Sequence, residues 1–191
     1  MILLISSVVL GIVCGRFVSF QISDNIITFL LMLLVFVVGI DIGSEEGILK
    51  RMKVNIPIII IQSVLVIAGT LLFAGATSIF TGFSFKEAMG ASAGMGWYSL
   101  SGVMISEMYS PFLGAVSFTS NIIREVISIL LIPFFAKVSQ LGAVSSAGAT
   151  SMDTLLGLIS KNTDKDSTLV AFGQGVILSM CVPLIISLIF G

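Results

Sequence analysis

Long apolar runs with few charges alternate with short polar connections along the whole chain. Seven such runs approach the roughly 20 residues that a helix needs to cross about 30 Å of hydrocarbon. Their approximate bounds are residues 2–20, 26–40, 56–80, 86–108, 112–136, 141–159 and 167–190. Because these runs are continuous and do not alternate in polarity, a transmembrane β-barrel is disfavoured. The pattern predicts an all-α polytopic membrane protein that forms a single transmembrane domain.

Composition supports this class and excludes several others. Hydrophobic residues make up 57% of the 191 residues and charged residues only 10%, against about 25% charged in an ordinary soluble domain. The chain has no histidine, which excludes histidine-based metal sites and triads. A net charge of −1 without a long basic run gives nucleic-acid binding no support. We therefore expect neither an enzyme nor a bound cofactor.

The connections predict how the runs are oriented. The connection over 43–55 is expected to be a solvated loop, since it holds the longest charged stretch, Glu45, Glu46, Lys50, Arg51 and Lys53. Pro57 then fits the first turn of the third helix, where its missing N–H costs nothing. Counting Lys and Arg in the short loops gives a modest bias toward a cytoplasmic N-terminus and an external C-terminus.

Two of the runs contain signals of interruption. The run over 86–108 carries Gly90, Gly94, Gly96 and Gly102, which suggests close packing, a broken helix or backbone that approaches a ligand. Mostly small residues fill 143–149 in the run over 141–159. That run is either one regular helix or a broken one, and broken helices in transporters expose carbonyls and helix ends to ligands.

Asp153 is the first functional candidate, because it places a carboxylate inside the apolar run over 141–159. An ionised Asp at the centre of a membrane helix costs about 2.5–3.5 kcal/mol on insertion scales, so such residues usually face a wet cavity or an ion path. Thr150 and Ser151 lie just before it. They either coordinate a polar group or cap the second half of a broken helix.

The run over 112–136 contains a polar stripe. Ser117, Asn121, Arg124, Glu125 and Ser128 fall within about 100° of one another on a helix, so they must face protein or water. In one interpretation Arg124 is a structural clamp that pairs with Glu125 or Asp153. In the other, Glu125 or Asp153 binds a proton or a cationic substrate group, and Arg124 positions a carboxylate. The sequence leaves both open.

An aromatic pair lies near the middle of the Gly-rich run. Trp97 and Tyr98 are about ten residues from each end, which argues against an interfacial aromatic belt. With the neighbouring hydroxyls of Ser99 and Ser101, such faces suit a primary ammonium group through cation–π attraction and hydrogen bonds. Interior packing is the alternative.

Taken together, three motifs resemble the lysine exporter (LysO) family. They are Gly96–Gly102, Asn121 with Arg124–Glu125, and Ala149–Asp153, and the resemblance covers nearly the whole chain. It implies an inner-membrane exporter of L-lysine and its toxic analogue thialysine, driven by the proton gradient. It also implies that Asp153 matches an intramembrane acidic residue important for export.

The same resemblance bears on partners. Full-length members begin with about three further spans that hold a second acidic residue, so we expect the C-terminal part of a split, ten-helix inverted-repeat transporter. A separate short protein would supply the missing helices, and a homo-oligomer stays open. The alternatives are a sodium-coupled carrier of another organic solute, since hydroxyls and broken-helix carbonyls also suit Na⁺, and a membrane subunit or scaffold that does not transport.

Overall fold

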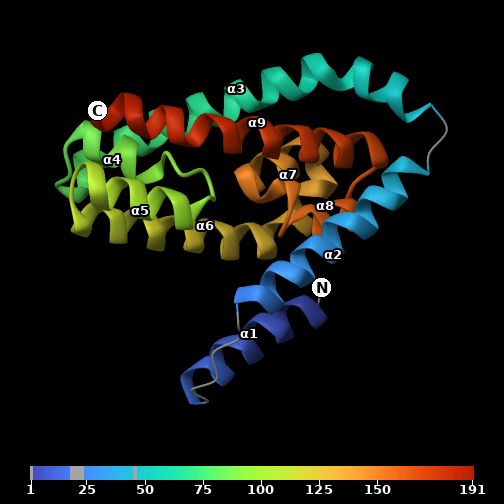
Figure 1. Ribbon diagram of the computed structural model, residues 1–191, viewed down its shortest axis with the longest axis horizontal. Helices are drawn as coiled ribbons and strands as arrows, with labels where there is room; N and C mark the ends of the chain where they lie inside the picture. Colours follow the sequence, from blue (N-terminus) through green and yellow to red (C-terminus); the bar gives the residue numbers. More distant parts are fainter. Residues whose placement is uncertain (1, 18–23, 45–46) are drawn as a thin grey trace.

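The computed structural model describes residues 2–17, 24–44 and 47–191, and within them all regular elements are helices (Figure 1). This confirms the all-α prediction. The elements are α1 (Ile2–Phe17), α2 (Asp24–Gly43), α3 (Ile48–Thr81), α4 (Phe85–Ser92), α5 (Tyr98–Met108), α6 (Pro111–Val138), α7 (Gln140–Ala147), the 3₁₀ turn η1 (Gly148–Met152), α8 (Leu156–Asn162) and α9 (Lys165–Phe190).

Within the described residues, three helices are long and apolar enough to cross a membrane: Lys50–Thr81, Pro111–Val138 and Lys165–Phe190. They frame the two pairs of short helices, α4 with α5 and α7 with α8 (Figure 1). Helix α1 and the first half of α2 project away from this bundle. The count of seven spans stays a prediction. It requires that α4 with α5, and likewise α7 with α8, together cross the membrane once.

Helix α3 begins earlier than its sequence suggests. It starts at Ile48, so Lys50, Arg51 and Lys53 lie on helical turns and not in a solvated loop, and Pro57 lies inside the helix. Placing Pro57 in the first turn was therefore wrong. The early turns are tied to the start of α9, where Arg51 Nε lies 3.6 Å from Asp166 Oδ1. Glu45 and Glu46 lie outside the described residues.

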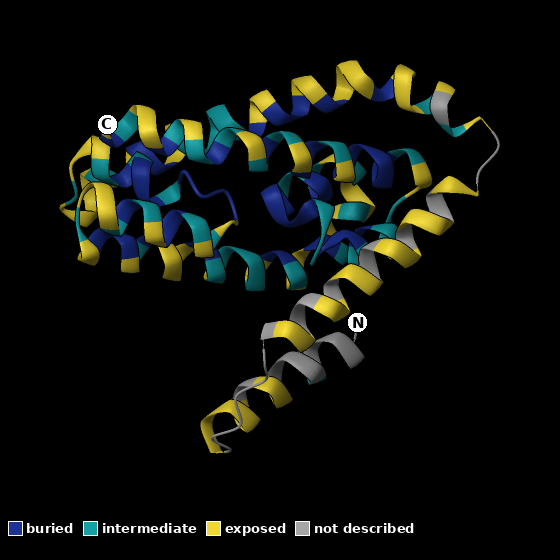
Figure 2. Cartoon of the chain, in the orientation of Figure 1, coloured by how far each residue is buried: buried dark blue, intermediate teal, exposed yellow. Residues whose placement is uncertain are grey.

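The burial pattern is that of a bundle with an apolar exterior. Large apolar side chains such as Leu65, Phe73 and Phe80 are exposed on α3 (Figure 2). Inside, one core cluster gathers around Met95, Ile105, Leu113, Leu178 and Ile186, and a second around Ile132, Val144, Leu155 and Ile159. A surface this apolar fits lipid better than water.

Both runs with interruption signals are broken, and the breaks touch. Between α4 and α5 the backbone turns sharply at Met95 (φ 49°) and Gly96 (φ 110°), and α7 ends at Gly148 (φ 64°). The amide of Ala149 donates to the carbonyl of Met95 at 2.8 Å. This bond joins the two interruptions. Because α7 is followed by the 3₁₀ turn η1 and α8 begins only at Leu156, the regular-helix alternative for 141–159 is excluded.

Gly148 is the position where a side chain is least tolerable. Its φ of +64° disfavours any Cβ, and a Cβ there would collide with the Met95 carbonyl and lie 2.9 Å from Arg124 Nη2. We expect Gly148→Ala to destabilise the fold by about 2 kcal/mol, measured as a lower midpoint of thermal unfolding in detergent. The matched control is Gly69→Ala, where nothing lies within 4 Å of the added Cβ. Equal midpoints for the two variants would contradict the described contact between the two helix breaks.

Candidate functional site

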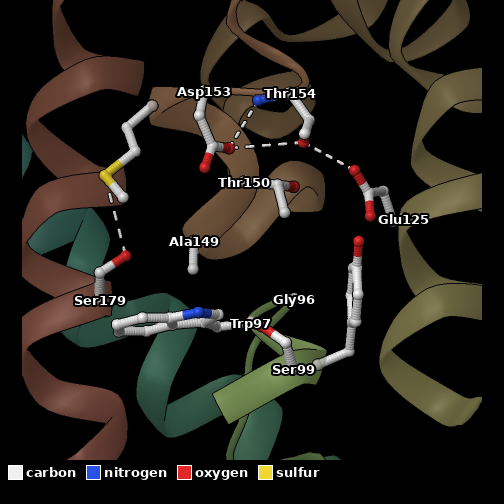
Figure 3. Close-up of a pocket in the computed structure, with 11 residues that line it drawn as sticks. Gly96, Trp97, Ser99, Glu125, Ala149, Thr150, Asp153, Thr154 and Ser179 are labelled. Atoms are coloured by element: carbon white, nitrogen blue, oxygen red, sulfur yellow. Dashed lines mark hydrogen bonds between the residues drawn. The ribbon is translucent and has the colours of Figure 1, made fainter. Parts of the chain in front are cut away.

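A cavity of about 250 Å³ lies where the two broken helices meet (Figure 3). Its walls come from the break before α5 and the first turn of α5, from η1 and the turn after it, and from α6 and α9. The lining residues are Gly96, Trp97, Tyr98, Ser99, Glu125, Ala149, Thr150, Met152, Asp153, Thr154 and Ser179. Six of the ten candidate residues thus gather at one cavity: Trp97, Tyr98, Ser99, Glu125, Thr150 and Asp153.

Two carboxylates share one wall of this cavity and are bridged by a threonine. The hydroxyl of Thr154 donates to Glu125 Oε1 at 2.6 Å, and its amide donates to Asp153 Oδ1 at 2.6 Å. The same hydroxyl lies 3.4 Å from Asp153 Oδ1. Thr154 therefore fixes one oxygen of each acid and sets the distance between them.

The other oxygen of each acid is available to a ligand. Apart from Thr154 and the amide of Asp153 itself, no described residue donates a hydrogen bond to either carboxylate, and no described Lys or Arg lies within ion-pairing distance of either group. Two carboxylates at membrane depth without a protein cation are costly unless something positive or a proton joins them. The geometry suits a small cation.

Aromatic and hydroxyl groups complete the cavity. The indole of Trp97 lies across it from Asp153, with Ala149 between them (Figure 3). Tyr98 packs edge-on against Phe118, with ring centroids 5.4 Å apart. Such an aromatic face opposite two carboxylates can hold an ammonium group by cation–π attraction. In the described part of the chain, no cluster of acidic or cysteine side chains could hold a metal.

Three candidate residues have structural roles instead. Asn121 accepts a hydrogen bond from the Gly96 amide at 2.8 Å and donates to the Ala91 carbonyl at 3.3 Å, so it ties α6 to the broken helix. Ser101 is buried and accepts from Ser117. Ser151 is buried and donates to the Ala171 carbonyl at 2.7 Å. None of the three lines the cavity.

The capping prediction for Thr150 and Ser151 is wrong. Both hydroxyls donate to carbonyls that precede them, Thr150 to Ala147 at 2.8 Å and Ser151 to Gly148 at 2.8 Å. The cap residue of α8 is Leu155, which has no side-chain bond to offer. The 3₁₀ turn η1 separates the hydroxyls from the start of α8, so they satisfy the end of α7 instead.

Arg124 faces a different cavity from Glu125. In the described structure no carboxylate lies within 4.0 Å of its guanidinium, so the clamp with Glu125 or Asp153 is wrong. Successive residues on a helix point about 100° apart. That rotation places Glu125 at the acidic cavity and Arg124 beside Asn121 at a second one. The predicted stripe is therefore divided.

The candidate residues predicted from the sequence do not include two polar residues of the cavity, Thr154 and Ser179. Thr154 is adjacent to Asp153 in sequence, and its position beside an intramembrane acid was a usable signal. Ser179 comes from α9, where its hydroxyl lies 3.8 Å from Met152 Sδ. Nothing in the sequence around Ser179 distinguishes it from other small residues of α9.

Together the fold and the cavity define a helical membrane protein whose discontinuous helices meet at a charged cavity, an arrangement that secondary transporters use. The family model described as lysine exporter LysO matches residues 5–190. The chain belongs to the lysine exporter LysO family. This confirms the resemblance that the three motifs indicated.

Two relatives show how much of the family this chain spans. It is 34% identical over 158 residues to the lysine exporter LysO of Escherichia coli, covering 82% of this chain and 52% of that protein. A Haemophilus influenzae protein that also carries a lysine-exporter name is 28% identical over 187 residues, covering 96% of this chain and 94% of the relative. The chain thus spans about half the length of the E. coli relative. No solved structure matches it.

The support that Asn121 gives to the break between α4 and α5 can be tested by mutation. Replacing it with alanine leaves the buried amide of Gly96 and the carbonyl of Ala91 without that partner, and we expect a loss of about 1–3 kcal/mol of folding stability. The control is Thr119→Ala, since Thr119 is exposed and bonds only within its own helix. Chemical unfolding in detergent measures both. An Asn121→Ala variant as stable as the control would show that Asn121 does not support the break.

Proposed function

We propose that this chain carries L-lysine, and analogues with the same charge such as thialysine, out of the cell across the inner membrane. The observation that supports it is the pair of carboxylates, Asp153 and Glu125, bridged by Thr154 in a cavity where no described cation neutralises them. Membership in the lysine exporter family supports lysine as the substrate, and the cavity is a candidate site for the ammonium group of its side chain.

The ammonium group is held from two directions in this proposal. Asp153 Oδ2 and Glu125 Oε2 accept its hydrogen bonds, and the face of Trp97 attracts its charge from the other side. Ser99 and Thr150 line the same space and add hydroxyl oxygens. Arginine is a poorer fit, because its wide planar guanidinium needs coplanar acceptors, whereas an ammonium is a compact charge.

Export of a cation needs an energy source. Moving one positive charge out against an inside-negative potential costs about 2.3 kcal/mol per 100 mV, before any concentration gradient. We propose that protons entering the cell supply this energy and that the two acids alternately hold a proton and the lysine ammonium. When the lysine ammonium leaves a carboxylate in this proposal, a proton takes its place on that carboxylate.

Two features of the setting are also part of the proposal. Assembly with a short helical protein would complete the carrier, so transport is assayed with the chain alone and together with any small helical membrane protein encoded beside its gene.

Sodium is the alternative coupling ion. Replacing Na⁺ by choline in the same flux assay separates the two, since a proton-coupled exporter keeps its rate.

Asp153→Asn removes the charge and one acceptor from the cavity while keeping its shape. We expect this variant to abolish lysine-driven proton movement in reconstituted vesicles, measured with an entrapped pH-sensitive dye. Glu107→Gln is the control, because Glu107 is exposed and lies outside the cavity. Normal coupling in the Asp153→Asn variant would remove this residue from the mechanism.

Thr154 is a positioning residue, and its role can be separated from charge. Thr154→Val removes the hydroxyl that bridges the acids, and since a hydrogen bond to a charged group contributes about 1.5–3 kcal/mol, we expect lysine affinity to fall by roughly tenfold or more. Thr154→Ser keeps the hydroxyl and should restore affinity. Isothermal titration of the purified variants measures this. If valine and serine behave alike, the bridge has no part in binding.

A further inference from the structure

Arg124 lies at a second cavity that shares no lining residue with the acidic one. This cavity has a volume of about 330 Å³. It is lined by Thr70, Phe73, Ala74, Thr77, Ser92, Ser120, Asn121 and Arg124, from α3, α4 and α6. The described residues that line it include no acidic side chain. Its one charge is therefore positive.

Several donors at this cavity have no partner among the residues that the structure describes. The guanidinium makes no ion pair or hydrogen bond to any described residue, and the hydroxyls of Thr70 and Ser92 make none either. By contrast, Thr77 and Ser120 donate to carbonyls of their own helices. The free donors of this cavity thus come from three different helices.

An unpaired guanidinium at membrane depth is costly, so its retention calls for a compensating anion. The guanidinium lies close to Gly148, just after α7, since a Cβ added at Gly148 would be 2.9 Å from Arg124 Nη2. A guanidinium presents a planar fork of donors that matches a carboxylate in a two-point contact. Neighbouring hydroxyls add single donors to such a group, as in other anion sites.

We propose that the cavity around Arg124 is a carboxylate-binding site, distinct from the acidic cavity. The guanidinium binds both oxygens of the carboxylate, and Thr70 and Ser92 donate to it from α3 and α4. The carboxylate comes from the amino acid being transported, in which case the site rests on the proposed function, or from a free carboxylate anion. Both sources share the chemistry that Arg124 recognises.

Labelling of the wild-type chain tests this without relying on transport. Phenylglyoxal reacts with accessible guanidinium groups, and mass spectrometry of the purified chain in lipid nanodiscs gives the rate at each arginine. We expect acetate and lysine to slow labelling of Arg124 about tenfold at a concentration about ten times the dissociation constant. Cadaverine, which is lysine without its carboxylate, should not slow it. Chloride at equal ionic strength is the blank.

Arg16 and Arg51 serve as internal controls, because their side chains are exposed or half-exposed and lie elsewhere. Protection by lysine alone assigns the site to the transported amino acid, and equal protection by acetate assigns it to a free anion. Protection by neither, or by cadaverine as strongly as by lysine, overturns the proposal. Lysine flux without any protection would support the proposed export and contradict the carboxylate site. Protection by acetate without lysine flux would support the carboxylate site and contradict the proposed export.

A variant pair adds a second measurement. Arg124→Lys keeps the charge and loses the fork, so acetate binding should weaken by roughly tenfold, the loss of about one charge-assisted hydrogen bond. Lys137→Gln removes an exposed cation from the end of the same helix and should leave acetate binding unchanged. Titration with labelled acetate by NMR measures both. Equal weakening in the two variants would mean that only overall charge attracts the anion.

Discussion

The structure depends on satisfying backbone groups where two helices break at membrane depth. Hydrocarbon offers no hydrogen bonds, so irregular backbone survives there only when protein groups supply partners. Asn121 binds the Gly96 amide, the Ala149 amide binds the Met95 carbonyl, and Gln174 Nε2 lies 3.2 Å from the Val144 carbonyl. Long helices α6 and α9 supply these side chains. The broken helices are thus held by the intact ones.

This arrangement also separates the charges. Arg124 and Glu125 are neighbours in sequence, yet they line cavities that share no residue. If they paired, each would neutralise the other and neither would attract a ligand. Holding them apart costs stability and leaves an acidic cavity and a basic one, with Asn121 bonded to Gly96 between them. A zwitterion with a distant ammonium and carboxylate is the kind of molecule for which such separation has a use.

Much of the fold could be predicted from the sequence, because lipid imposes long apolar runs and glycines mark the breaks. The gathering of Asp153 with Glu125 and Trp97 was also accessible, since charges inside membrane segments must face an interior. The direction of Arg124 was not, because a stripe about 100° wide can face one cavity or two. The roles of Ser151 and Asn121 were hidden for another reason: their partners are carbonyls and amides of broken turns, whose positions no spacing reveals. The early turns of α3 contact the start of α9, where Asn55 Nδ2 donates to Asp166 Oδ1 at 3.3 Å. These two residues are over a hundred positions apart, so no local pattern could reveal the contact.

The bond between Ala149 and Met95 also governs how this bundle can move. If the broken helices drew apart there, the buried Ala149 amide and Met95 carbonyl would both lose their partner, at a cost of several kcal/mol. If the helices tilt about that point, the bond survives. For the proposed transport, opening the interior to one side of a membrane and then the other would therefore cost least as a tilting of the short half-helices about this bond.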